Sequence, residues 1–242
     1  ILPPIREWLA THPDGRLIEP FAGGAAVYLG LAPRQGILAD AVDGLARLYS
    51  TVRDDYDGVH EWMMWYAREY PQPDKEAYLR VRTEVPVEPP RHAAWMIYLS
   101  RTSFNGLWRE NKRGQMNVPW GGERSPEWPT LADLATAARA LAGAEIGRWS
   151  YVDTVSAAGE GDVIYADSPF DGAYEGYATA GEWIVNHDQL ADMLWDAHSR
   201  GVMIVASQPN TDAARERYSG WCEGIEVATT YRVGGRGARR AG

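Results

Sequence analysis

Cysteine is nearly absent from this sequence, and its scarcity excludes two kinds of site. Cys222 is the single cysteine among 242 residues, so the chain forms no internal disulfide and offers no paired thiolates to a metal ion. A nucleophilic role for Cys222 would need a basic partner, and the sequence identifies none. We expect neither a disulfide scaffold nor a metal site.

Long hydrophobic runs are also missing. No stretch of about 18 apolar residues occurs, and the first residues, ILPPIREWL, lack the basic and apolar regions of a signal peptide. At 45% hydrophobic, the chain has enough apolar residues for a sizeable core, as one large domain or one domain with an insertion. We expect a soluble, cytoplasmic protein with no membrane partner.

Positive charge is scarce overall but unevenly distributed. The formal net charge of −9 argues against a nucleic-acid partner, because phosphate binding depends on Lys and Arg. Residues 101–124, however, contain five basic side chains and only two acidic ones, and residues 232–240 contain four arginines and no acid. Two basic segments on an acidic body favour a protein that meets a polyanion on one face, with solvated surface charge as the alternative.

Strand and helix patterns alternate at both ends of the sequence. GRLIEPFAGGAAVYLGL (15–31) predicts a strand at Leu17 and Ile18, a Gly-rich turn and a helix from about Ala25, and GILAD (36–40) predicts a second strand before another helix. GDVIYAD (161–167), a helix at about 188–199 and GVMIVAS (201–207) resume the alternation. This pattern is typical of an α/β fold with a mostly parallel sheet and helices on both faces.

Residues 51–144 differ in character from the two ends. They contain amphipathic segments such as GVHEWMMWYAREY (58–70) and RHAAWMIYLSRTSF (91–104), separated by the Pro-rich VPVEPPR (85–91). We interpret them as a helical insertion in a domain formed by residues 1–50 and 145–242.

Ligands of such sheets bind beyond the carboxyl ends of the strands, where this sequence places Glu19 to Gly24, Asp40, Asp153, and Asp167 to Phe170. Gly23 and Gly24 have no Cβ and allow a ligand to approach the backbone, and Asp40, 21 positions after Glu19, is well placed for ribose hydroxyls. These features indicate an adenosine-containing cofactor, with a structural glycine turn as the alternative. The spacing is not G-x-G-x-x-G, which disfavours a nicotinamide dinucleotide and leaves S-adenosylmethionine open.

The stretch DVIYADSPFDG (162–172) ends a predicted strand in an Asp-x-Pro-aromatic tetrad. The exocyclic amine of a nucleobase is a poor nucleophile, because its lone pair is delocalised into the ring. A carboxylate and a backbone carbonyl that each accept one N–H would localise that pair, and an aromatic ring would hold the base by stacking. Such a base must first be flipped out of the duplex. An Asp at a strand end is also a common turn residue, so the tetrad alone is a weak signal.

Five motifs in order resemble the Dam-type family of DNA adenine methyltransferases. EPFAGGAAV is similar to the family's cofactor loop, ILADAVDGLARLY to its second motif, SYVDTV to the motif at the cofactor adenine, and DSPF to its catalytic Asp-Pro-Pro-Tyr. The most specific match is RTSFNGLWRENKRGQMNVPWG (101–121), which resembles the family's Asn-Gly-Leu-x-Arg-x-Asn and Asn-Val-Pro-Phe-Gly. The resemblance implies a Rossmann-like methyltransferase fold with an inserted helical DNA-recognition subdomain, S-adenosylmethionine as cofactor and double-stranded DNA as partner.

The resemblance also implies roles for individual residues. Asp167 and the Ser168 carbonyl would bind the target amine, with Pro169 beside them and Phe170 stacked on the base. Asp40 would bind the ribose and Asp153 the adenine of the cofactor. The methionine end would lie against the cofactor loop, which contains Glu19, Phe21, Ala22, Gly23 and Gly24.

DNA contacts are implied for the basic segments. Asn105 and Arg109 are candidates for phosphate or base contacts, since Arg bidentate to guanine is the commonest specific contact, and RVGGRGARR (232–240) resembles the family's basic loop. Asn105-Gly106 could instead be only a turn, and we expect Trp108 and Trp120 to pack rather than to read bases. The remaining candidates for DNA contact are Arg101, Asn111, Arg113, Asn117, Arg236 and Arg239.

Two departures from the family pattern bear on activity. The family's Lys-Trp-x-Gly-x-Lys stretch is absent, because this chain begins just after it, so we expect either a trimmed chain or weaker cofactor binding. Ser168 replaces a Pro, which keeps the carbonyl but removes the restriction that Pro places on its own φ and on Asp167. We expect a site-specific DNA adenine methyltransferase. The alternatives are a weakened or inactive relative that binds DNA as a competitor or regulator, and an enzyme with an altered base modification.

Overall fold

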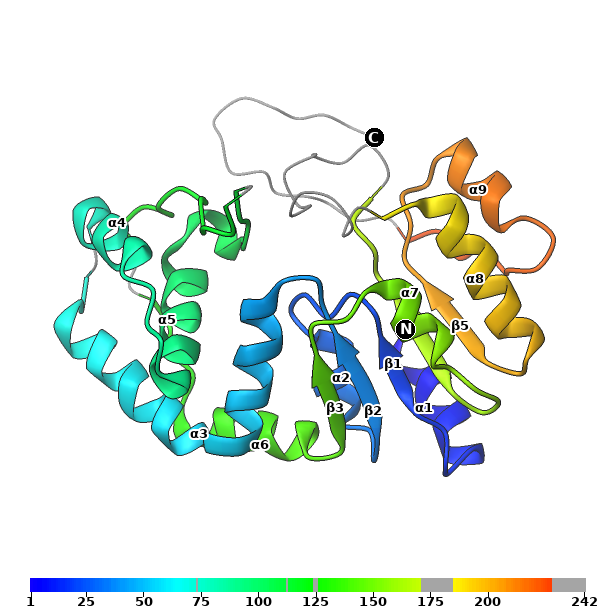
Figure 1. Cartoon of the computed structure of the whole chain (residues 1–242), viewed down its shortest axis with the longest axis horizontal. Helices are drawn as coiled ribbons and strands as arrows, with labels where there is room; N and C mark the ends of the chain where they lie inside the picture. Colours follow the sequence, from blue (N-terminus) through cyan, green and yellow to red (C-terminus); the bar gives the residue numbers. More distant parts are fainter. Residues whose placement is uncertain (73, 112, 124–125, 171–184, 228–242) are drawn as a thin grey trace.

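An all-parallel sheet forms the centre of the structure (Figure 1). The structure is a computed structural model that describes residues 1–72, 74–111, 113–123, 126–170 and 185–227, and within them the sheet has five strands in the order β3-β2-β1-β4-β5. Because β3 is followed in the chain by β4 on the other side of β1, the strand order reverses between β1 and β4. The strands are β1 Leu17–Glu19, β2 Gly36–Ala39, β3 Ala144–Gly147, β4 Val163–Ala166 and β5 Met203–Ala206.

Helices cover both faces of the sheet, because successive strand residues point to opposite faces. Leu17 and Val163 join a core with helices α1, α2, α3 and α6, whereas Ile18 and Ile164 join a second core with α7 and α8. The predicted fold class is therefore confirmed. The helices are α1 Leu2–Thr11, α2 Ala26–Leu31, α3 Asp43–Glu69, α4 Lys75–Thr83, α5 Pro89–Thr102, α6 Leu131–Leu141, α7 Tyr151–Ser156, α8 His187–Ser199 and α9 Asp212–Tyr218.

Helix α3 runs through the boundary that the sequence suggests near residue 50. It is interrupted at Asp55, which has non-helical dihedrals (φ −150°, ψ 56°) and accepts a hydrogen bond from the Gly58 amide at 3.0 Å. The first half of α3 and α6 lie beside β3, and the second half lies with α4 and α5 away from the sheet (Figure 1). Tyr98 on α5 belongs to the same core as Leu17 on β1. The division into two parts stays a prediction.

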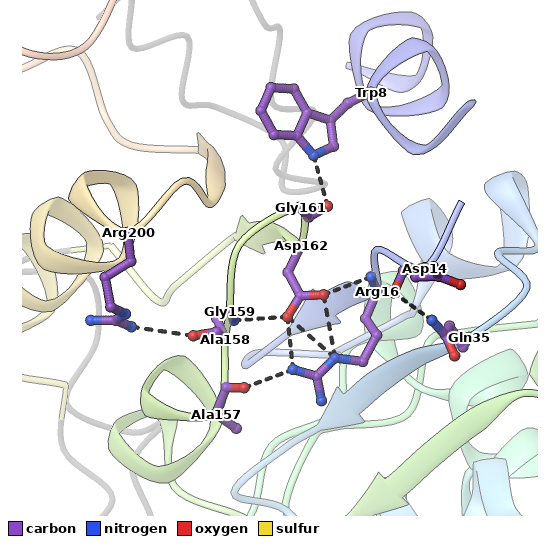
Figure 2. Close-up of polar contacts among 10 residues, drawn as sticks. All are labelled: Trp8, Asp14, Arg16, Gln35, Ala157, Ala158, Gly159, Gly161, Asp162 and Arg200. Atoms are coloured by element: carbon purple, nitrogen blue, oxygen red, sulfur yellow. Dashed lines mark hydrogen bonds and ion pairs between the residues drawn. The ribbon is translucent and has the colours of Figure 1, made fainter. Parts of the chain in front are cut away.

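An ion pair between half-buried Arg16 and buried Asp162 ties the amino ends of β1 and β4 together (Figure 2). Asp162 precedes β4 and is 4% exposed, and its carboxylate accepts hydrogen bonds from the Arg16 backbone amide at 2.7 Å, the Arg16 guanidinium at 2.7 Å and the Gly159 amide at 2.9 Å. Trp8 on α1 adds an indole hydrogen bond to the Gly161 carbonyl at 2.9 Å. This end of the sheet is stabilised by polar contacts and lies opposite the carboxyl ends, where the predicted site residues gather.

Candidate active site

Glu19 ends β1 and is a buried acid with an unused acceptor. It is 1% exposed, and within the described residues its Oε1 has no hydrogen-bond partner. Burial raises the pKa of Glu19 to about 8, although a hydrogen bond from the Tyr28 backbone lowers it, and the charge of Asp167 raises it further. A buried polar atom without a partner is unusual in folded proteins and marks a position where a ligand can supply the missing contact.

The glycine loop after Glu19 is held from two sides. Gly23 is in the left-handed region (φ +46°), its amide donates to Asp40 Oδ2 at 2.9 Å, and its carbonyl accepts from the Tyr49 hydroxyl at 2.5 Å. A Cβ added at Gly23 or Gly24 would meet no described atom within 4 Å. The loop therefore presents backbone that no described side chain covers at these two glycines, which suits the close approach of a ligand.

Asp40 follows β2 and organises this loop. Its Oδ1 accepts from the Val42 amide at 2.8 Å, and its Oδ2 accepts from Gly23. Burial raises the pKa of Asp40, while these backbone hydrogen bonds oppose the rise. Each carboxylate oxygen has a second lone pair, so Asp40 can hold the loop and still accept a ligand hydroxyl.

An aromatic pair lies beside the loop, between β1 and α7. The rings of Phe21 and Tyr151 stack with centroids 5.8 Å apart, and the Tyr151 hydroxyl donates to Gln189 Oε1 at 2.8 Å. Asp153 is exposed in the first turn of α7, where its carboxylate accepts from the Ser150 hydroxyl at 2.7 Å. The sequence does not single out Tyr151, although it lies within SYVDTV two positions before Asp153.

The predicted catalytic tetrad follows β4. Asp167 and Pro169 are exposed, Phe170 is partly buried and Ser168 is 2% exposed. Because β1 and β4 pair in parallel, with Ile18 opposite Ile164, Glu19 and Asp167 end adjacent strands. Burial raises the pKa of Tyr165 to about 12, and the negative charges of Asp167 and Glu19 contribute to the rise. The structure thus places the two acids next to each other at the carboxyl ends of β1 and β4.

Ser168 makes a side-chain contact that the sequence does not predict. The Gln208 side-chain amide donates to Ser168 Oγ at 3.1 Å. Gln208 comes two residues after β5, which pairs with β4 in the register Ala166 to Ala206. This contact depends on strand register and has no signal in the sequence of either segment.

Residues 103–111 and 113–120, here called the recognition hairpin, fold back on each other. Antiparallel bridges join Ser103 to Trp120 and Glu110 to Met116. Asn105 lies in the left-handed region (φ 53°), as does Gly106 (φ 68°), and both are exposed. The turn predicted as the alternative for Asn105-Gly106 is present, and a DNA contact by the exposed Asn105 side chain stays a prediction.

Three of the predicted DNA-binding residues stabilise this hairpin. Arg109 Nε donates to Asn117 Oδ1 at 2.6 Å. Asn111 Oδ1 accepts from the backbone amides of Arg113 at 2.9 Å and Gln115 at 3.1 Å, and Asn111 Nδ2 donates to Gln115 Oε1 at 3.1 Å. Their DNA contacts stay predictions, because these observations show how the hairpin is held and not what it binds.

The remaining candidates for DNA binding differ in accessibility. Arg101, in the last turn of α5, and Arg113 in the hairpin are exposed. Trp108 packs edge-on against Trp95 with ring centroids 5.7 Å apart and donates to Glu110 Oε1 at 3.0 Å, as expected for a packing residue. Arg236 and Arg239 lie outside the described residues.

Neither a metal-binding cluster nor a membrane-spanning helix occurs among the described residues. No group of three or more His, Cys, Asp or Glu side chains there is arranged to hold a metal ion. No helix in the same part of the chain is long and apolar enough to cross a membrane.

Comparison with known proteins identifies the family. The model of the D12 class N6 adenine-specific DNA methyltransferases matches residues 1–233. The chain is 32% identical over 212 residues to the DNA adenine methylase of Serratia marcescens, covering 84% of this chain and 77% of that protein. It is 30% identical over 224 residues to the retron Ec67 DNA adenine methylase of Escherichia coli, covering 90% and 76%.

A phage relative is much longer than this chain. The DNA N-6-adenine-methyltransferase of Escherichia phage P1 is 29% identical over 215 residues, which make up 85% of this chain but 28% of the phage protein. The family match over nearly the whole chain confirms the family predicted from the motifs, whose chemistry is S-adenosylmethionine-dependent methylation of DNA adenine. The chain belongs to the D12 class N6 adenine-specific DNA methyltransferase family.

Proposed function

We propose that this chain is a site-specific DNA adenine methyltransferase, which transfers a methyl group from S-adenosylmethionine to the N6 amine of an adenine flipped out of double-stranded DNA. The observation that carries the proposal is the meeting of Glu19, the Gly23–Asp40 contact and the Asp167–Ser168 segment at the carboxyl ends of β1, β2 and β4. Reversal of strand order beside these ends is typical of a ligand site in such sheets. Since its relatives come from bacteria and phage, we expect it to act in the bacterial cytoplasm.

The residues around the glycine loop fit the cofactor. S-adenosylmethionine supplies an electrophilic methyl group on a sulfonium ion. Glu19 Oε1, which has no partner among the described residues, is suited to the amino group of the methionine part. No described atom would lie within 4 Å of a Cβ at Gly23 or Gly24, so this part of the loop, with Ala22 next to it, admits the backbone-like atoms of the methionine part. Asp40 would accept a ribose hydroxyl. Asp153 would bind the exocyclic amine of the adenine, and Tyr151, whose ring stacks on that of Phe21, offers ring surface to the adenine.

The residues after β4 would prepare the nucleophile. Asp167 and the Ser168 carbonyl each accept one N–H of the target amine, which favours tetrahedral geometry and localises the nitrogen lone pair. Phe170 stacks on the flipped base and Pro169 restricts the backbone between them. The gain in rate comes from proximity and from acceptors that are already oriented, without a covalent intermediate on the protein.

The recognition hairpin and its neighbours would meet the DNA. Exposed Arg101, Asn105 and Arg113 would contact phosphates or bases, while Arg109, Asn111 and Asn117 keep the hairpin in shape beside them. Arg236 and Arg239 would add phosphate contacts from the basic carboxyl-terminal segment. Phosphate contacts fix the register of a protein on the duplex, and sequence is read at the base edges.

A nucleoside mass spectrum tests this proposal. Unmethylated double-stranded DNA is incubated with the protein and S-adenosylmethionine and then digested to nucleosides for analysis. We expect N6-methyl-2′-deoxyadenosine among the products. DNA that is bound but unmodified would point to the inactive relative, and a different modified base would point to an altered base modification. Either result would overturn the proposed activity.

A further inference from the structure

The segment after β5 approaches the catalytic segment through the strand ladder. β4 and β5 pair from Val163 with Met203 to Ala166 with Ala206, and the Ser207 amide then donates to the Ala166 carbonyl at 3.0 Å. The ladder thus extends one residue past β5. It brings Gln208 alongside Ser168, where the 3.1 Å hydrogen bond forms.

Within the described residues, the Ser168 hydroxyl and the Gln208 side chain have only each other as hydrogen-bond partner. Ser168 is 2% exposed, and among the described residues its hydroxyl is the one hydrogen-bond partner of the Gln208 side chain. Gln208 Oε1 is buried without a partner in the same part of the chain. Leaving one end of a buried amide unpaired is unfavourable. The hydrogen bond to Ser168 is therefore the one polar contact that favours this position of the Gln208 side chain within the described residues.

Pro209 restricts the backbone that carries this amide. A residue before Pro is confined to the extended or polyproline region, so Gln208 is held in a narrow range. A Pro at position 168 would restrict Asp167 in the same manner, and Ser168 does not. The restriction that is missing at 168 is present at 209, and the Gln208 side chain links the two segments.

We propose that Gln208 is a positioning residue for methyl transfer: its side-chain amide holds Ser168 and thereby orients the Asp167 carboxylate and the Ser168 carbonyl. The inference rests on the proposed function and deepens it, because these two groups are the acceptors assigned to the target amine. Gln208 acts through Ser168 and is not itself a catalytic residue.

A double-mutant cycle of Gln208→Ala and Ser168→Ala tests the coupling. A neutral hydrogen bond of ordinary strength predicts that each single substitution lowers kcat about three- to tenfold, with KM for DNA and for S-adenosylmethionine within twofold. The double variant should be no slower than the slower single variant, since both remove the same contact. Gln35→Ala is the matched control: it removes a glutamine hydrogen bond, to the Asp14 carbonyl at 2.6 Å, at the other end of the sheet (Figure 2) and should leave kcat unchanged.

A rescue separates positioning from general stability. Ser168→Pro in the Gln208→Ala background should recover most of the lost kcat, because Pro restricts Asp167 directly. Independent effects of the two alanine substitutions, a rise in KM in place of a fall in kcat, or a failed rescue would overturn the proposal.

Amide hydrogen exchange gives a readout that needs no turnover. In Gln208→Ala the amides of Asp167, Ser168 and Phe170 should exchange at least threefold faster than in the native chain, with those of α5 unchanged. If the native chain transfers no methyl group, the proposed function fails, and this measurement alone decides the present inference. Equal exchange of the three amides in both proteins overturns it in either case.

Discussion

Glu19 links the stability of the protein to pH. Its pKa is raised by burial from 4.5 to about 8, so between these values the folded chain retains a proton that the unfolded chain has lost. Stability falls with rising pH wherever the folded state binds more protons. Glu19 therefore lowers the free energy of unfolding as the pH rises from about 4.5 to about 8, by at most about 5 kcal/mol.

Glu19→Gln should remove this dependence, because the amide cannot ionise. We expect the free energies of unfolding of the two proteins to be similar near pH 5 and to differ by a few kcal/mol at pH 8 in favour of the variant. Urea unfolding at a series of pH values measures the difference. Parallel curves for variant and native chain would show that Glu19 is ionised throughout.

The sequence predicts which residues lie at the ends of the strands better than it predicts which distant side chains contact them. Glu19, Asp40 and Asp167 are recognisable because each follows a predicted apolar run, and the fold brings them together at the carboxyl ends of β1, β2 and β4. Tyr151 and Gln208 are not recognisable, because their contacts with Phe21 and Ser168 depend on how distant segments pack. The hydrogen bonds of Asn111 within its own turn are likewise invisible until the hairpin is formed.

Among the secondary-structure elements, β1 and β4 depend on the Arg16–Asp162 pair. The hydrogen bonds and charge of Asp162 raise the pKa of Arg16. Asp162→Ala removes the acceptor of the Arg16 and Gly159 backbone amides as well as the ion pair, so it should lower the free energy of unfolding by about 3 kcal/mol. Asp54→Ala, which breaks the Arg53–Asp54 pair where Asp54 is 62% exposed, should cost under about 1 kcal/mol. Denaturant unfolding compares them, and equal losses would contradict the structural role of Asp162.

The recognition hairpin should show its own dependence on Arg109 and Asn117. Because these side chains bond to each other, we expect Arg109→Ala and Asn117→Ala to reduce discrimination between the target site and single base-pair variants by a similar amount, about 1 to 3 kcal/mol. Equilibrium binding to a panel of duplexes measures it. If Asn117→Ala leaves discrimination intact while Arg109→Ala lowers it, Arg109 reads a base directly and does not act through the hairpin.

The sequence predicts four of the five strands seen in the described residues. β1, β2, β4 and β5 have apolar runs before a polar residue, whereas β3, Ala144–Gly147, contains Glu145 and is only partly buried along its length. Because the sequence does not reveal β3, it predicts Asp153 at the end of a strand. That prediction is wrong, since the structure places Asp153 in the first turn of α7. Helix α3 passes residue 50 without a break and is interrupted only at Asp55, after which it continues to Glu69. The composition of the sequence does not reveal this.

The whole molecule is acidic, so DNA binding must depend on a few local cations. With a net charge of −9, each phosphate contact should count in the salt dependence of binding. Arg101→Ala and Arg113→Ala should each reduce the slope of log K against log salt by about 1 and weaken binding to all sequences alike. Arg139→Ala, at the exposed end of α6 that precedes β3, should leave the slope unchanged. Equal slopes for all four proteins would exclude Arg101 and Arg113 from the interface.

The central claim is that the site at the carboxyl ends of β1, β2 and β4 catalyses methyl transfer to adenine, with Asp167 as an acceptor for the target amine. The most direct test is the yield of N6-methyladenine from unmethylated DNA and S-adenosylmethionine carrying a deuterated methyl group, measured by mass spectrometry for the native chain and for Asp167→Ala. The account predicts labelled N6-methyladenine from the native chain and none from Asp167→Ala, with cofactor affinity within a few-fold of the native value. Undiminished labelling by Asp167→Ala, or none by the native chain, would contradict it.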